Sequence, residues 1–180
     1  MNNVSDWKLT TQLIMTIFAA SLAACTEKKV VTAEIGSTNL SQMITKANAT
    51  RPSNIPKTLI TSSSCSFDRF DGLARETVSV VKDKSKVNLN GWMGNPASTG
   101  APGPIVLEMD GPSKFYFAGK RSLKRPDVAA ALKKPVLVDS GWESNVDLSA
   151  VPPGSYKLHL IMLDEQSGSV CDPNGTIVVK

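Results

Sequence analysis

Short apolar segments separated by turn residues limit this chain to a β-rich fold. Each segment is rich in β-branched or aromatic residues, and most end near glycine, proline, asparagine or aspartate. The segments are 77–81, 87–92, 105–109, 115–117, 136–139, 142–148, 156–163 and 176–179. Turn signals recur about every ten residues, which is typical of an antiparallel β-sandwich. The sequence therefore predicts an all-β sandwich domain over residues 65–180.

One short helix is predicted between the strands. Residues 127–134 (DVAAALKK) follow Pro126, and proline suits the first position of a helix. Lys133 and Lys134 would then lie in the last turn, where positive charge is favourable. Pro135 ends the pattern, because proline cannot continue a helix. We expect one or two helical turns that cross between strands.

Glycine and proline also predict two breaks between strands. Residues 94–104 (GNPASTGAPGP) are too rich in both to form a strand, and they predict a long loop. Residues 172–175 (DPNG) predict a turn before the last strand. Long loops in compact domains often carry function, so the first of these breaks is a candidate part of a binding surface.

Two of the three cysteines are expected to pair. Cys65 and Cys171 are left once Cys25 is assigned to the N-terminal signal described below, and an even pair in an exported chain favours a disulfide. Closing a loop of about 100 residues would stabilise the fold by about 4–5 kcal/mol in the chain-entropy model. The alternative is a metal site, for which two cysteines and one distant histidine are a poor ligand set.

The N-terminal residues predict export. The apolar run 13–20 is shorter than the roughly 20 residues that a membrane-spanning helix needs, and small residues follow it. The next residues, 22–25 (LAAC), resemble the lipobox of bacterial lipoproteins. This resemblance implies a signal peptide over residues 1–24 and acylation (palmitate among the chains) of Cys25, which would anchor the protein stably to a membrane. The alternatives are an ordinary signal peptide or a buried apolar helix.

The residues after Cys25 predict a location and a spacer. Thr26 stands where aspartate would imply retention in the inner membrane, so the resemblance implies the outer membrane of the cell envelope, facing the periplasm or the surface. Residues 25–64 are rich in serine, threonine and lysine, contain no aromatic residue, and include Pro52 and Pro56. We expect a flexible, largely disordered tether. The alternative is that part of it forms a strand of the domain.

Length and composition limit the domain count and the partners. A chain of 180 residues suits one domain with a tether, and 41% apolar residues are enough for a core. The net charge of +4 is mildly basic, without the basic stripe of a nucleic-acid binder. Nucleic acid is therefore not an expected partner.

Several short motifs together resemble a known kind of protein module. They are Gly91-Trp92, Asp110-Gly111, 125–128 (RPDV), Gly141-Trp142, 148–154 (LSAVPPG) and 156–158 (YKL), within the range 87–163. Their order is similar to Ig-like β-sandwich domains appended to exported glycan-acting and cell-surface proteins. The resemblance implies a non-catalytic accessory fold. Trp142 stands where that pattern usually has phenylalanine, and the pair Cys65 and Cys171 is not part of it.

No catalytic constellation is evident in the sequence. A serine hydrolase needs a base beside its nucleophile, and the one histidine, His159, lies within an apolar strand segment where a half-exposed structural role is expected. There is no GxSxG elbow, and residues 94–103 lack the ending of a phosphate-binding loop. We therefore expect a protein that is not an enzyme and has no cofactor.

Two carboxylates are considered as a cation site. Asp68 and Asp71 lie three residues apart, with Glu76 nearby. A glycosidase pair is one interpretation, and calcium on oxygen ligands is a better one. Solvated or turn-forming carboxylates are the alternative. No other metal site is predicted.

Aromatic residues and one arginine are the candidate ligand-binding residues. Trp142, Tyr116 and Trp92 could form a platform for stacking sugars, with core positions as the alternative. Arg125 could contact a ligand or could instead form a local clamp with Asp127 at the start of the helix.

These observations predict a lipid-anchored bacterial envelope protein that binds or organises glycan or protein without catalysis. Two alternatives remain. One is a small envelope hydrolase or an inhibitor of one. The other is a structural or assembly lipoprotein of a secretion or surface-polymer system.

Overall fold

The computed structural model describes residues 46–99, 101–164 and 167–180. The predicted signal peptide 1–24, the lipid attachment site Cys25 and the first part of the predicted tether lie outside the described residues. In the part of the chain that is described, no helix has the length and apolar character needed to cross a bilayer.

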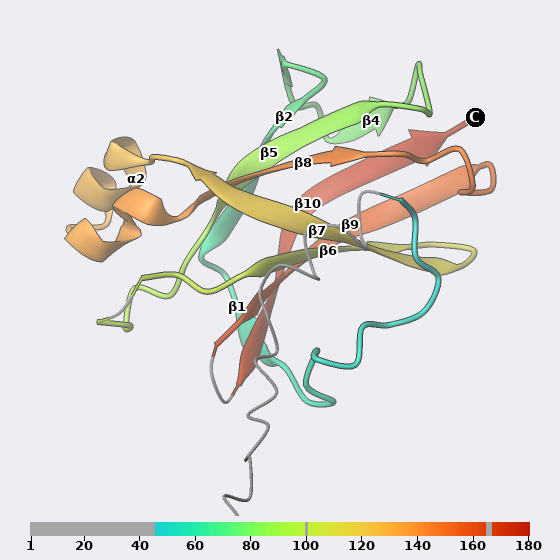
Figure 1. Cartoon of the computed structure of the whole chain (residues 1–180). Coiled ribbons are helices and arrows are strands. Elements are labelled where there is room, and N and C mark those ends of the chain that lie inside the picture. The colour runs from blue at the N-terminus through green and yellow to red at the C-terminus, as the bar shows by residue number, and fades with distance from the viewer. Residues whose placement is uncertain (1–45, 100, 165–166) are drawn as a thin grey trace, which may run out of the picture. The chain divides into compact units, whose positions relative to one another are not determined.

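Most of the described chain is β-strand (Figure 1). The strands are β1 (Ile60–Ser62), β2 (Cys65–Phe70), β3 (Leu73–Ala74), β4 (Val78–Val80), β5 (Val87–Met93), β6 (Ile105–Asp110), β7 (Lys114–Leu123), β8 (Gly141–Val146), β9 (Gly154–Leu163) and β10 (Gly168–Val179). One short α-helix, α2 (Pro126–Ala131), and one 3₁₀ helix, η1 (Pro135–Asp139), connect β7 to β8. Over the described residues, the prediction of a β fold with one short α-helix is confirmed.

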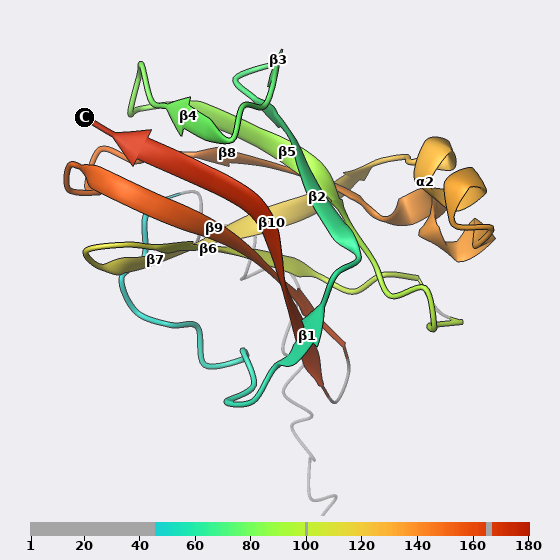
Figure 2. The ribbon, with the colours of Figure 1, turned by 180° about the vertical axis from the view of Figure 1, so that it is seen from behind.

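The strands form one continuous sheet that folds at β7. The order is β1-β10-β9-β6-β7-β8-β5-β2-β3, and β4 pairs separately with β10. The first half of β7 pairs with β6 and its second half pairs with β8, so β7 belongs to both halves of the sheet. The view from behind shows β10 passing beside β2 (Figure 2). A Cβ built on Gly175 of β10 would lie 2.8 Å from the Phe67 ring of β2, so these two strands pack closely.

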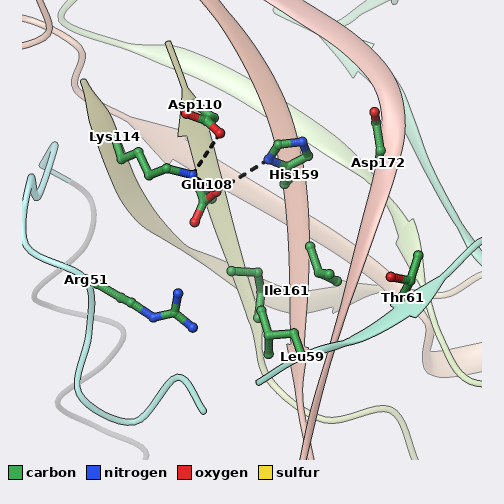
Figure 3. Close-up of a pocket in the computed structure, with 10 residues that line it drawn as sticks. Arg51, Leu59, Thr61, Glu108, Asp110, Lys114, His159, Ile161 and Asp172 are labelled. Carbon is green, nitrogen blue, oxygen red and sulfur yellow. Dashed lines mark hydrogen bonds and ion pairs between the residues drawn. The ribbon is translucent and has the colours of Figure 1, made fainter. Parts of the chain in front are cut away.

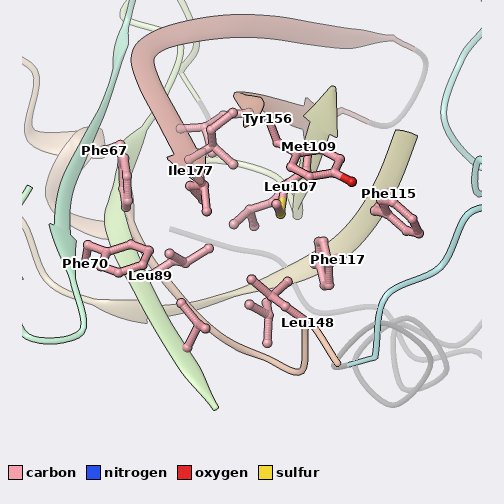
Figure 4. Close-up of a cluster of buried hydrophobic side chains, with 14 of the residues drawn as sticks. Phe67, Phe70, Leu89, Leu107, Met109, Phe115, Phe117, Leu148, Tyr156 and Ile177 are labelled. Carbon is pink, nitrogen blue, oxygen red and sulfur yellow. The ribbon is translucent and has the colours of Figure 1, made fainter. Parts of the chain in front are cut away.

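The core lies between the two halves of the sheet (Figure 4). Strand β5 shows why: its residues alternate between buried and half-buried, as expected where one face of a strand packs on a core. The buried side chains from β2 and β5 meet those from β6, β7, β9 and β10, among them Phe67, Leu89, Leu107, Phe117, Tyr156 and Ile177. Gly91 fits this packing because a Cβ there would lie 2.0 Å from the Ser66 carbonyl oxygen.

A disulfide joins the two halves. Cys65 at the start of β2 is bonded to Cys171 in β10, with their Cα atoms 6.3 Å apart. The two cysteines are 106 residues apart in the sequence, so the bond closes most of the domain into one loop. The predicted Cys65–Cys171 bridge is confirmed.

Three local predictions were wrong. Residues 172–175 form a bulge within β10, where the register with β9 shifts, and not a turn between strands. Residues 136–139 form η1 and not a strand, because Leu137 is fully buried and its N–H is bonded to the Lys134 carbonyl. Helix α2 ends at Ala131, so Lys133 and Lys134 follow the helix, with Lys133 at φ +54°.

Residues 46–62, which we call the strap, pack on the outer face of the sheet. Backbone hydrogen bonds join Asn48 to Tyr116, and Ile55 is 4% exposed. β1, at the end of the strap, pairs in parallel with β10. The predicted disordered tether to residue 64 is therefore corrected over residues 46–64, because these residues satisfy backbone groups and cover apolar side chains of the sheet. Here the alternative, a strand contributed by this segment, is what the structure shows.

Candidate ligand pocket

A pocket of about 380 Å³ lies between the strap and the outer face of β6, β9 and β10 (Figure 3). The sheet contributes Glu108, Asp110, Lys114, His159, Ile161, Val170 and Asp172, and the strap contributes Arg51, Leu59 and Thr61. Six of these side chains are ionisable, three acidic and three basic. The pocket therefore combines opposite charges within one small site.

Strand register explains why the charged groups meet. Glu108 on β6 lies directly opposite His159 on β9 and opposite Tyr116 on β7. Asp110 is two residues further along β6, and its partner on β7 is Lys114. Because side chains alternate between the faces of a strand, these residues all lie on the outer face of the sheet.

The charged groups form one connected network. The Lys114 Nζ lies 2.9 Å from Glu108 Oε1 and 2.8 Å from Asp110 Oδ2. The His159 Nδ1 lies 3.4 Å from the same Glu108 oxygen. Tyr116 lies opposite Glu108 on β7. The Glu108 carboxylate is therefore the centre of the network, and the Glu108 side chain is only 10% exposed.

These contacts shift the pKa values of Glu108 and His159. The hydrogen bond from His159 is the main cause that lowers the pKa of Glu108 to about 2, with Lys114 and Tyr116 adding to it against the opposing effect of burial. The hydrogen bond to Glu108 raises the pKa of His159, with smaller contributions from the charges of Asp172 and Asp110. Glu108 is therefore ionised at neutral pH, and His159 keeps its proton to a higher pH than a free imidazole.

One wall of the pocket is apolar. Under the strap, Ile55 packs with four buried side chains of the sheet: Val106, Tyr116, Ile161 and Leu163. Leu59 and Val170 pack against this cluster and also line the pocket. A ligand in the pocket would therefore meet charged groups on the sheet and apolar surface beside the strap.

Among the predicted ligand-binding residues, the aromatic rings are mostly buried. Trp142 is 0% exposed and belongs to the main core, while Tyr116 is 3% exposed beneath the strap. Trp92 is half-buried, and it does not line the pocket. The predicted exposed platform of Trp142 and Tyr116 is thus corrected, because the core and the strap cover these two rings.

Arg125 forms a local clamp. It hydrogen-bonds Asp127 through Nε and Nη2, at 2.9 and 2.7 Å, and Asp68 through Nη1 at 2.5 Å. Hydrogen bonding to Arg125 is the main cause that lowers the pKa of Asp127 to about 2. The clamp ties the start of α2 to β2, which matches the structural alternative for Arg125.

The two carboxylates considered for calcium both have protein partners. Asp68 is paired with Arg125, and Asp71 Oδ1 accepts a hydrogen bond from the Asn88 N–H at 2.8 Å. Within the described ranges, the set of three carboxylate or imidazole groups close enough to share an ion is Glu108, Asp110 and His159.

His159 was considered from the sequence only as a catalytic base and was expected to have a structural role, and neither it nor Glu108 and Asp110 was predicted as a site residue. The side chain of His159 is 22% exposed, as expected for a half-exposed strand residue. Glu108 and Asp110 interrupt the otherwise apolar segment 105–110 at alternate positions. This alternation was the one sequence signal that both side chains share a face of the strand. The pairing of β6 with β9 and β7 brings these residues together, and no local pattern specifies that pairing.

Comparison with known proteins found no matching family model, curated protein or solved structure.

Proposed function

We propose that this chain is a lipid-anchored bacterial envelope protein whose β-domain is a non-catalytic binding module. The observation that carries the proposal is the pocket, where charged groups from three strands and the strap converge on a rigid sheet. Binding sites commonly combine apolar surface with a few fixed polar groups in this way. The Cys65–Cys171 disulfide suits an oxidising compartment such as the envelope.

The module is of the Ig-like kind. In Ig domains strands A, B, E and D form one sheet, strands C, F and G form the other, and the connections are Greek keys. The order β3-β2-β5-β8 on one side and β6-β9-β10 on the other supports this assignment. A second support is the Tyr156 hydroxyl at the start of β9, which donates to the Pro152 carbonyl at 2.9 Å, as in the tyrosine corner of such domains.

The partner is a protein segment with charged side chains. The exposed large hydrophobic residues of the described chain are aliphatic, which leaves no fully exposed aromatic ring there for sugar stacking. The pocket offers Lys114 and Arg51 to acidic groups, and Asp110 and Asp172 to basic groups. Charge complementarity of this kind favours a protein partner over a neutral glycan.

Site-specific photo-crosslinking in intact cells tests this function. A photoreactive amino acid is placed at Thr61 in the pocket and, as the matched control, at Lys86 in the exposed turn before β5. We expect a discrete protein adduct from Thr61 that is absent from Lys86. The charge-reversing substitution Asp172→Lys in the Thr61 background should reduce this adduct.

Two results would contradict the proposal. Equal adducts from Thr61 and Lys86 would mean that the partner does not contact the pocket more than the rest of the surface. Adducts that disappear on digestion with glycan hydrolases, but not with proteases, would show that the partner is a glycan.

A hydrolase is the second candidate, because the pocket places a carboxylate–imidazole pair near a hydroxyl residue. Glu108 orients His159, and Thr61 lines the same pocket. No hydrogen bond joins Thr61 to His159 in the described structure, whereas nucleophilic catalysis needs that contact. Covalent labelling of Thr61 by a hydroxyl-directed phosphonate would favour this candidate over simple binding.

A further inference from the structure

We propose that Glu108, Asp110 and His159 form a binding site for a divalent metal ion of the zinc class. The ion takes the position that the Lys114 ammonium now holds. This site goes beyond the proposed binding function, and its presence does not depend on the identity of any protein partner.

The donor set suits such an ion. Two carboxylates and one imidazole are ligands that Zn²⁺ accepts, at about 2.0–2.2 Å from the metal. One donor atom from each of the three residues lies within 4.8 Å of the others. Two ligands of one zinc ion lie at most about 4.4 Å apart, so side-chain shifts of about 1 Å would close the site.

Lys114 marks the position of a cation. Its Nζ bridges Glu108 Oε1 and Asp110 Oδ2 at 2.9 and 2.8 Å, so both carboxylates are directed at one point. The Lys114 side chain is 49% exposed and comes from β7 next to the tight turn at residues 111–113. Because a lysine side chain is long and flexible, the ammonium can move into solvent without disturbing the sheet.

The surroundings support the three ligands. The backbone pairing of β6 with β9 holds Glu108 opposite His159. The pairing of β6 with β7 places the buried Tyr116 opposite Glu108, which confines the carboxylate on its second side. The pocket opens to solvent beside these groups, which gives the ion an entry path and room for water as a further ligand.

The test measures metal binding by the full chain, purified in detergent with a tag that lacks histidine. Zn²⁺ affinity is measured by competition with a chromophoric chelator, and Co²⁺ serves as a spectroscopic probe of the ligands. We expect one ion per chain, and visible Co²⁺ absorption bands that depend on His159. His159→Gln and Asp110→Asn should each weaken Zn²⁺ binding at least about tenfold.

Two matched controls separate ligation from general electrostatics. Asp172→Asn removes the same charge as Asp110→Asn from the same pocket but not a proposed ligand, so it should change affinity by no more than about twofold. Lys114→Met should tighten Zn²⁺ binding, whereas Lys120→Met, an exposed lysine of the same strand, should not. Unchanged affinity in both Lys114→Met and His159→Gln, with each variant folded by circular dichroism, would overturn the proposal.

Discussion

Glu108 and His159 face each other across β6 and β9, and the imidazole Nδ1 lies 3.4 Å from the carboxylate Oε1. Both side chains are largely shielded from water, with exposures of 10% for Glu108 and 22% for His159. Their interaction is therefore less screened than that of a surface pair. Each of them holds the other in its charged form, which makes the stability of the domain depend on pH.

The first prediction concerns this pH dependence in the metal-free protein. The folded-state pKa of Glu108 is lowered from 4.5 to about 2, so its stabilisation is complete above about pH 4.5 and is lost as the pH falls towards 2. The pKa of His159 is raised above 6.5, so its contribution is complete below pH 6.5 and is lost as the pH rises through the folded-state value. The pair should therefore stabilise the fold most between about pH 4.5 and 6.5.

Urea unfolding of the wild type and Glu108→Gln across pH, in the presence of a chelator, measures this effect. The difference in the free energy of unfolding should be largest in that window and should decrease on both sides. A difference that does not vary with pH would show that the two charges are not coupled.

The disulfide should contribute strongly to stability. The double substitution Cys65→Ala and Cys171→Ala opens a loop of 106 residues, and we expect a loss of about 2–5 kcal/mol in the free energy of unfolding. Guanidinium unfolding with and without reductant measures it. Reductant should destabilise the wild type and leave the double variant unchanged; equal stability of the two proteins without reductant would contradict the prediction.

Trp142 should behave as a core residue. It is fully buried in the main cluster, so Trp142→Ala should lower the free energy of unfolding by about 3–5 kcal/mol. Trp92→Ala, at a half-buried position in β5, is the comparison and should cost clearly less. Thermal melting of the two variants tests this difference. Similar decreases in melting temperature would mean that the burial of Trp142 does not make it more important for stability than Trp92.

The clamp at Arg125 should matter more than the neighbouring ion pair. Arg125 is 19% exposed and contacts both Asp68 and Asp127, whereas Lys124 is 70% exposed and contacts Asp139. We expect Arg125→Ala to cost about 1–3 kcal/mol and Lys124→Ala less than about 1 kcal/mol. Urea unfolding of both variants at two salt concentrations measures these losses in the free energy of unfolding. A larger loss in Lys124→Ala than in Arg125→Ala would contradict the prediction.

The lipid anchor is tested independently of the fold. Cys25→Ala should abolish incorporation of labelled palmitate and leave either an uncleaved precursor or a soluble form, because the thiol is the acceptor in the lipobox resemblance. Cell fractionation and label incorporation measure the outcome. The double variant at Cys65 and Cys171 is the control and should still be labelled; label that persists in Cys25→Ala would refute the anchor.

The sequence was sufficient to predict most strands and the disulfide. Strands such as β5 could be predicted because alternation of buried and half-buried residues is a local property, and the disulfide followed from the two cysteines left in an exported chain. The strand predicted at residues 136–139 was wrong. Their β-branched residues favour a strand, whereas burial of Leu137 and the flanking hydrogen bonds favour a 3₁₀ helix.

The pocket could not be predicted in the same way. Glu108 and His159 come from strands that are distant in the sequence, and their contact depends on which strands pair and in which register. The strap was predicted to be a disordered tether because of its polar composition, and the short apolar run at residues 59–60 supported only the alternative of a strand, which does not show that Ile55 and Leu59 cover the sheet. Tertiary packing therefore determined both the site and the segment that borders it.

The strap also has a mechanical consequence. A pull on the N-terminal side of the domain must pass through residues 46–62 before it reaches β2, and this segment supplies Arg51 and Thr61 to the pocket. At its end, β1 pairs in parallel with β10, so a pull on the strap also acts on this pairing. Tension on the N-terminal side of the domain would therefore reach Arg51 and Thr61 in the pocket wall before it reaches the core.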